Sequence, residues 1–168
     1  MNIFFLHLNP KICATFHVDK HVVKMCLETL QILCSVYLLT ESEYKPPYKL
    51  THKNHPCNIW ARESIDNFKW LVQLGIELCK EYTHRYQKNH KCEQYIVDMA
   101  KKENYPNLPN KGFTPPAQAM PQQYKDKNPV VAYRHYYFFE KHSLLKWTKR
   151  DIPEFIVEYK KMFEDDDT

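Results

Sequence analysis

The sequence predicts an all-α protein: a compact single-domain bundle of two long and two or three shorter helices with a long proline-rich loop. Apolar residues recur at three-to-four spacing, whereas the period-two alternation of strands is nowhere sustained. Only two glycines occur among 168 residues, which leaves few positions for tight hairpins. The length fits one domain over residues 1–168, ending in an acidic tail at about 164–168.

The first long helix is predicted to begin at Asn9-Pro10, because asparagine is a preferred N-cap and proline a preferred first helical residue. We expect a short break near His17 and then a helix to about Leu39. Residues three and four apart form its buried stripe: Val22, Cys26, Leu30, Leu33 and Tyr37.

A second long helix is predicted over about residues 57–86, after a proline-containing loop at 41–56. Trp60 and Trp70 supply bulky packing groups. The remaining apolar face consists of Ile65, Phe68, Val72, Leu78, Cys79 and Tyr82.

Three further elements follow. A short helix is expected at about 92–102, and a proline-punctuated stretch at 104–128 resembles a loop that covers a site. A helix is predicted to run from Asn128-Pro129 to about residue 146. The last helix is expected to have Asp151 as its cap, with Glu154 in the capping-box position.

Composition limits the function. With two glycines, a glycine-rich phosphate-binding loop is excluded. The net charge of +4 permits nucleic-acid or nucleotide binding without requiring it. Six scattered cysteines without a CxxC pair, no signal-peptide pattern and no apolar run approaching about 18 residues predict an intracellular protein outside the membrane, in the host cytoplasm if viral.

Residues 17–28 concentrate ionisable side chains on an otherwise apolar helix. His17 and His21 are four apart and Glu28 follows His21 by seven, so all three share roughly one helical face. Such groups are costly to bury unless they are paired or used. We favour acid–base chemistry by Glu28 near a phosphate held by Lys20 or Lys24. A histidine-based metal site and a solvated face of charge pairs are the alternatives.

Residues 51–64 place Asn54, His55 and Arg62 where a loop enters the second helix. The free N–H groups of a helix start favour an anion, and Arg62 would add positive charge. The alternatives are a zinc site formed by His52, His55 and Cys57, or a plain helix cap made by Asn54.

Residues 132–147 interleave aromatic and basic side chains, a composition suited to stacking on bases beside phosphate contacts. Tyr133, Arg134 and Tyr137 are the candidates for binding, whereas Phe138 and Phe139 fit a core. The preceding loop offers amide groups that can bind polar edges of a base or sugar: Gln118, Gln122 and Gln123.

Five blocks of this sequence resemble a family of small phage and large-virus proteins, in the same order along the chain: DKHVVKMCLE, THKNHPCNIWARES, LCKEYTHRYQK, TPPAQAMPQQYK and AYRHYYFFEK. More distantly, the chain resembles the phage-type pyrimidine-dimer DNA glycosylases, which are compact all-helical repair enzymes. Asp19, His21 and Glu28 match their D-x-H-x6-E pattern, and Tyr133 to Tyr137 resembles their C-terminal W-Y-K-Y-Y stretch along DNA.

The resemblance implies that Glu28 is catalytic and that an N-terminal main-chain amine attacks the sugar C1′, forming an imine before strand cleavage. An α-amine with a pKa near ~8 is partly neutral at physiological pH and is therefore competent for this step. Residue 2 is Asn, so the amine would be that of Met1. Five extra residues precede Asp19, and Leu27 and Gln31 replace the arginines that flank the family's glutamate; Lys20 and Lys24 would have to replace them.

The sequence thus predicts a DNA-repair-like glycosylase/AP lyase for damaged or modified pyrimidines, without a cofactor or metal. Glu28, His21 and Met1 would be catalytic, and a flipped nucleotide would stack on Tyr133 or Trp147. The alternatives are an enzyme acting on free nucleotides, favoured by the modest charge, a non-enzymatic nucleic-acid or host-protein binding module, and a histidine-rich metalloenzyme. The predicted binding residues are Lys20, Lys24, Asn54, His55, Arg62, Gln118, Tyr133, Arg134 and Trp147.

Overall fold

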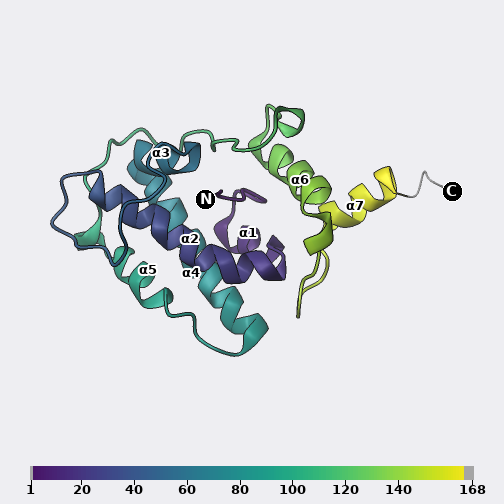
Figure 1. Cartoon of the computed structure of the whole chain (residues 1–168), viewed down its shortest axis with the longest axis horizontal. Helices are drawn as coiled ribbons and strands as arrows, with labels where there is room; N and C mark the ends of the chain where they lie inside the picture. The colour runs from purple at the N-terminus through teal and green to yellow at the C-terminus, as the bar shows by residue number, and fades with distance from the viewer. Residues whose placement is uncertain (1, 165–168) are drawn as a thin grey trace.

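The computed structural model describes residues 2–164, and these residues form helices and loops without a strand (Figure 1). The predicted all-α class is therefore confirmed. Met1 and most of the acidic tail, residues 165–168, lie outside the described residues. The α-helices are α1 (Pro10–Phe16), α2 (Asp19–Leu38), α3 (Pro56–Glu63), α4 (Ile65–Tyr86), α5 (Glu93–Met99), α6 (Pro129–Glu140) and α7 (Glu154–Phe163), with short 3-10 helices η1 (Lys102–Asn104), η2 (Gln122–Tyr124) and η3 (His142–Leu144).

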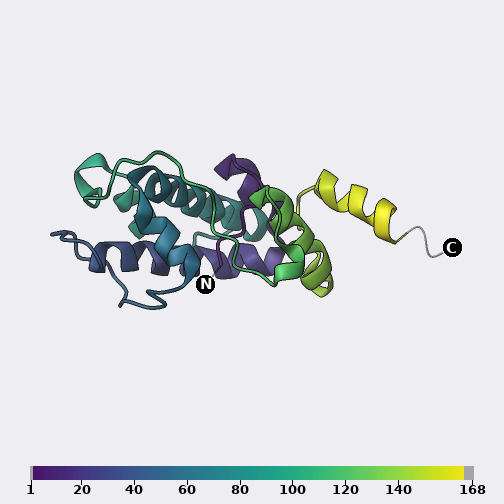
Figure 2. The same ribbon diagram turned by 90° about the horizontal axis from the view of Figure 1, so that it is seen from above.

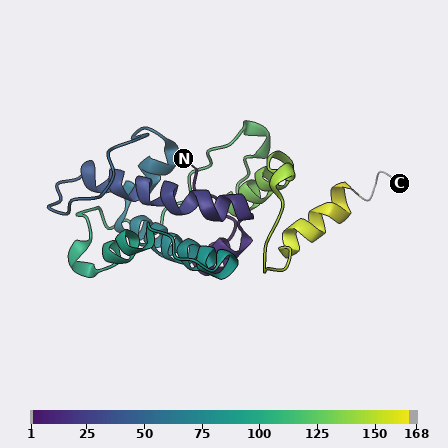
Figure 3. The same cartoon turned by 60° about the horizontal axis from the view of Figure 1, so that its bottom comes forward.

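The core lies between α2 and α4, which run side by side, as Figure 3 shows. The five residues of the predicted α2 stripe are all buried. Gly75 of α4 allows a close approach of three helices, because a Cβ there would lie 3.1 Å from Ile96 of α5 and 3.2 Å from Thr29 of α2. Helix α6 lies at one end of this body and α7 extends beyond it (Figure 2).

The first described residues form an extended segment that runs through the protein interior. Ile3, Phe4, Phe5 and Leu6 are all buried. The Ile3 N–H donates to Cys57 Sγ of α3 at 3.3 Å, and the Phe4 ring stacks on His21 of α2 with centroids 4.5 Å apart. This segment therefore joins α2, α3 and the C-terminal half of the chain into one core.

Two helix starts and one break agree with the sequence prediction. The Asn9 side chain accepts hydrogen bonds at the start of α1, and Asn128 does the same for α6. His17 and Val18 have extended backbones, which separates α1 from α2.

Three predicted boundaries were wrong. The second long helix is interrupted at Ser64, whose Oγ accepts from the Lys111 N–H at 3.2 Å while the Ile65 N–H donates to the Pro109 carbonyl at 2.9 Å. Helix α6 ends at Glu140 instead of continuing to residue 146. Helix α7 begins at Glu154, directly after Pro153, so Asp151 is not its cap.

Helix α2 is long and apolar enough to cross a membrane by length and composition, contrary to the expectation that no such run is present. However, 67% of that window is buried inside the protein. Burial against neighbouring helices explains its hydrophobicity, because a core helix of a globular fold has the same composition.

An ionic cluster formed by Asp19, Glu81, Arg85 and Arg150 ties α2, α4 and the segment before α7 together. Its first three members are buried, and Arg150 joins them with a side chain that is 37% exposed. Arg85 donates to Glu81 at 2.8 Å and to Asp19 at 3.0 Å, and Arg150 donates twice to Glu81. Thr148 adds hydrogen bonds to Asp19 at 2.8 Å and 2.6 Å. Burial raises the pKa of both carboxyls, but these donors outweigh it and hold each pKa below its ordinary value.

Candidate active site

Lys20, Lys24 and Glu28 lie four residues apart on α2 and so share one face of that helix. The Glu28 side chain is 18% exposed, and its Oε1 lies 3.9 Å from Nζ of Lys24, which is 64% exposed. Within residues 2–164 no group donates a hydrogen bond to the Glu28 carboxylate. This carboxylate is therefore available to accept a hydrogen bond from a substrate.

His21 lies about one turn before the Lys24–Glu28 pair. The Tyr137 hydroxyl contacts its Nδ1, and the Phe4 ring stacks on its face. Its Nδ1 is 2.7 Å from the Tyr137 hydroxyl, which also accepts a hydrogen bond from the Val18 N–H at 2.9 Å. A Tyr137 hydroxyl that donates to Nδ1 leaves the imidazole proton on Nε2 and gives its own proton an acceptor. Burial, followed by the charges of His17, Lys141 and Lys24, lowers the pKa of His21 to about 3. His21 is consequently neutral at physiological pH.

His17 is buried and points elsewhere. Its Nδ1 is 2.7 Å from the Cys13 carbonyl oxygen, and its Nε2 has no partner within the described residues. Burial lowers the pKa of His17 to about 4. In residues 2–164 we find no group of three or more His, Cys, Asp or Glu side chains arranged to hold a metal ion.

These two pKa values predict how stability depends on pH. An unfolded histidine has a pKa near ~6.5, so the unfolded chain binds more protons than the folded one below that pH, and stability falls as the pH drops. His17 and His21 together should reduce the free energy of unfolding by about 3 kcal/mol between pH 7.5 and pH 5.5. Urea denaturation at the two pH values measures this change. Equal stability at both pH values would contradict the buried neutral histidines, and His17→Leu should remove about half of the loss.

The extended N-terminal segment approaches the same region. Asn2, the first described residue, donates from Nδ2 to the Ala119 carbonyl at 3.0 Å, and Ile3 is bonded to Cys57 at the start of α3. In Figures 1 and 3 the beginning of the described chain lies beside α2 and α3. The predicted nucleophile, the amine of Met1, is outside the described residues and stays a prediction.

The start of α3 differs from the prediction. His55, and not Asn54, caps the helix, since its Nδ1 accepts from the Cys57 N–H at 3.0 Å. Asn54 is exposed in the loop before it. Arg62 belongs to the last turn of α3, but its side chain donates to the Lys53 carbonyl at 2.8 Å, two residues before the cap His55. Arg62 therefore holds the preceding loop and places its positive charge beside the loop that enters α3.

Two aromatic rings predicted to stack on a nucleotide are covered by the protein. Tyr133 is fully buried; its hydroxyl donates to the Ala117 carbonyl and accepts from the Ala119 N–H at 3.2 Å, which fixes the proline-rich loop. Trp147 is 8% exposed and donates from Nε1 to the Phe16 carbonyl at 2.8 Å. In this arrangement neither ring is accessible to a base.

Arg134 and Gln118 are also engaged within the protein. Arg134 donates from Nε to the Leu6 carbonyl at 2.9 Å, and its guanidinium lies 5.0 Å from the ring centre of Phe155. Gln118 binds Asp126 through both ends of its amide, at 2.6 Å and 3.0 Å. Phe138 is buried as predicted, whereas Phe139 is 44% exposed.

The fold also adds a residue that was not selected from the sequence as a site residue. Lys141 follows Tyr137 by four positions, and its N–H donates to the Tyr137 carbonyl at 3.1 Å. Its ammonium lies 5.2 Å from the ring centre of Tyr136. Because Tyr137 binds His21, Lys141 stands at the edge of the same site. The aromatic and basic pattern of residues 132–147 contained this signal, but only the tertiary contact locates it.

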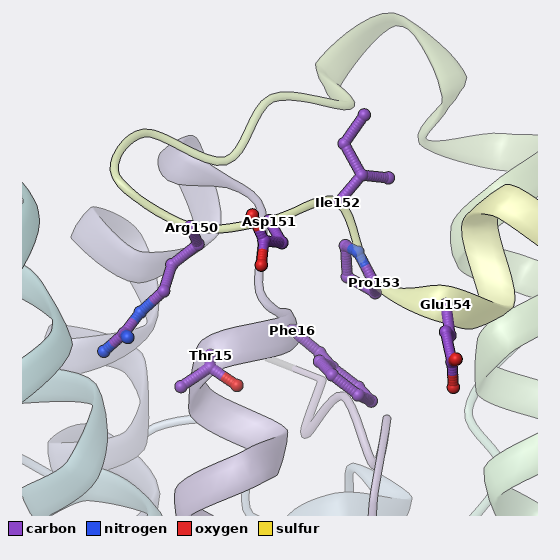
Figure 4. Close-up of a pocket in the computed structure, with 7 residues that line it drawn as sticks. All are labelled: Thr15, Phe16, Arg150, Asp151, Ile152, Pro153 and Glu154. Atoms are coloured by element: carbon purple, nitrogen blue, oxygen red, sulfur yellow. The ribbon is translucent and has the colours of Figure 1, made fainter.

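A hollow of about 360 Å³ lies between α1 and the segment leading to α7 (Figure 4). Arg150 lines it, but that guanidinium is already paired with Glu81. Asp151 and Glu154 add negative charge to the rim. The hollow is thus separate from the Glu28 face and does not suit a phosphate.

A comparison with protein-family models matches residues 1–94, more than half of the chain, to the pyrimidine dimer DNA glycosylase family. The chain belongs to this family. Comparisons with curated proteins and with solved structures give no match.

The family is one of DNA-repair glycosylases with lyase activity, so damaged DNA is the substrate. The matched residues of this glycosylase include α2, and with it Asp19, His21 and Glu28, as well as α3 and most of the N-terminal core. The match ends before α6, so the similarity of Tyr133 to Tyr137 to the family's C-terminal stretch remains a prediction.

Proposed function

We propose that this glycosylase excises damaged pyrimidines from DNA, with Glu28 as the carboxylate that acts on the sugar and with Lys20 and Lys24 binding the flanking phosphates. The observation that carries this assignment is the Glu28 carboxylate itself. It is largely buried, accepts no hydrogen bond from residues 2–164 and lies on the helix that the family match includes.

The N-terminal amine is the proposed nucleophile. Asn2 and Ile3 are anchored next to α3, and Phe4 is anchored on His21, seven residues before Glu28. An amine at this end of the chain would bond to C1′ as the bond to the damaged base breaks and the electron pair leaves with the base. The C1′–O4′ bond then breaks, O4′ takes up a proton given up by the attached amine, and the ring-opened sugar is held as an imine. Removal of a C2′ proton finally expels the 3′ phosphate.

Glu28 is suited to two tasks in this sequence of steps. A carboxylate close to C1′ stabilises the positive charge that develops on the sugar as the base leaves. The same group can accept a proton from the attacking amine or from C2′. Neutral His21 contributes by orienting Phe4 and the extended segment, because both its Nδ1 and its ring face are already occupied.

The lysines supply the phosphate contacts that the replaced arginines would otherwise make. Lys20 and Lys24 are exposed, and the Lys24–Glu28 pair is long, with its lysine side chain in solvent. Such pairs contribute little to stability, so a DNA phosphate can take over Lys24 at small cost. That exchange would also release the carboxylate for chemistry.

Borohydride trapping on a duplex containing one abasic site tests the proposed function. We expect a covalent protein–DNA adduct at neutral pH that maps to the N-terminal peptide, together with strand cleavage at the site and at a thymine dimer. An adduct on an internal lysine peptide would reject the N-terminal amine as nucleophile. Absence of both adduct and cleavage, with turnover of free nucleotides, would favour the nucleotide-modifying alternative.

A further inference from the structure

We infer that Lys141 forms a second phosphate-binding point. Together with the point formed by Lys24, it would hold the DNA strand across His21. This inference rests on the proposed function and names a substrate contact from the part of the chain beyond the family match. Lys141 directly follows the last residue of α6, and Lys24 lies in the second turn of α2.

Lys24 belongs to the element that contains His21, and Lys141 directly follows the element that contacts it. The Tyr137 hydroxyl bonds to His21, and Lys141 lies one helical turn further along α6 on the same face. Lys24 lies three residues after His21 on α2, which again is the same face of its helix. In agreement, the charges of both lysines contribute to the lowered pKa of His21.

The surroundings leave the Lys141 charge without a counterion. Its side chain is half-buried and its ammonium lies over the Tyr136 ring, a contact that orders the side chain without neutralising it. In the described part of the chain no carboxylate lies within ion-pair distance of Lys141. The neighbouring Glu140 carboxylate instead accepts from the Tyr124 hydroxyl at 2.9 Å.

A phosphate diester is the ligand that fits this arrangement. Two cations on different parts of the fold can bind one anionic strand at two points, and Glu28, one turn beyond Lys24, then faces the sugar between or beside them. Two ammonium groups would repel a metal cation, and they would make no specific contact with an uncharged apolar ligand. Lys141 would thus place the damaged strand over the N-terminal segment.

The test measures affinity separately from chemistry. The probe is a duplex with a tetrahydrofuran abasic-site analogue, which cannot form an imine. Lys141→Gln should raise the dissociation constant about tenfold at 0.1 M salt and reduce the slope of log affinity against log salt by about 0.9, the loss of one phosphate contact. Lys161→Gln, which changes an exposed lysine on α7, is the matched control and should change affinity less than twofold.

Lys141→Arg keeps the charge and should retain the wild-type affinity and slope. A Lys141→Gln protein with unchanged affinity and salt slope would overturn the inference, as would a Lys141→Arg protein that binds as weakly as Lys141→Gln while keeping the wild-type melting temperature. The proposed function and this inference fail in different experiments. If the proposed function is wrong, the wild-type protein does not cleave abasic-site DNA. The effect of Lys141→Gln on binding to the analogue is measured independently of that cleavage.

Discussion

Replacing Glu28 with Gln is expected to lower the single-turnover rate on abasic-site or dimer-containing DNA by at least about 100-fold, the usual range for removing an acid–base group. The substitution keeps the size of the side chain and removes its charge. Since residues 2–164 donate no hydrogen bond to this carboxylate, the folded structure should lose almost no stability. Single-turnover kinetics at saturating DNA and a thermal melt provide the two measurements.

Glu77→Gln is the matched control for this experiment. Glu77 on α4 is 11% exposed, and its Oε1 lies 3.6 Å from Lys80, so it resembles Glu28 in burial and in its lysine pair, although it also accepts a hydrogen bond from Gln73 at 3.0 Å. That control should retain the wild-type rate. DNA affinity of Glu28→Gln should be unchanged or slightly higher, because Lys24 loses its competing carboxylate. A Glu28→Gln enzyme with nearly normal rates would show that Glu28 is not the catalytic carboxylate.

Replacing Glu81 with Ala should destabilise the protein by about 3–5 kcal/mol, which corresponds to a fall in melting temperature of roughly 10 °C. The Arg85 side chain is fully buried and Glu81 is 4% exposed, so the substitution leaves a buried guanidinium with only one of its two carboxylate partners. Arg150 loses its carboxylate at the same time. Chemical denaturation of the purified protein measures the change.

Lys80→Ala provides the comparison with a solvent-exposed pair on the same helix. Lys80 is 65% exposed and is paired with Glu77 three residues away, so its loss should cost less than about 0.5 kcal/mol. If Glu81→Ala cost no more than Lys80→Ala, the ionic cluster would not be a major source of stability in this fold.

The sequence predicted correctly those features that depend on residues close together in the chain, such as helix caps and the buried stripe of α2. Asn9 and Asn128 cap their helices, and the stripe from Val22 to Tyr37 is buried, because capping and periodicity depend on residues close in sequence. The interruption at Ser64 depends on hydrogen bonds to Pro109 and Lys111, more than 40 residues away. No local pattern contains that information.

In the candidate site, too, contacts within one helix were predictable from the sequence, whereas long-range contacts were not. The spacing of Lys24 and Glu28 on one helix was sufficient to predict that they lie together. The burial of Tyr133 and Trp147 was not predictable, because an aromatic residue beside basic ones has the same sequence signature in a core and on a base-stacking surface. The approach of Lys141 to His21 depends on the long-range contact made by Tyr137.

The buried segment at residues 3–6 has a consequence for biosynthesis. Phe4 packs on Tyr137, and Phe5 packs on Tyr133, so this segment finds these partners only after α6 has also emerged from the ribosome. A nascent chain lacking α6 leaves Phe4 without its Tyr137 contact and Phe5 without its Tyr133 contact. The N-terminal core is therefore complete only after α6 has been synthesised, and products terminated before residue 129 should be inactive and prone to aggregate.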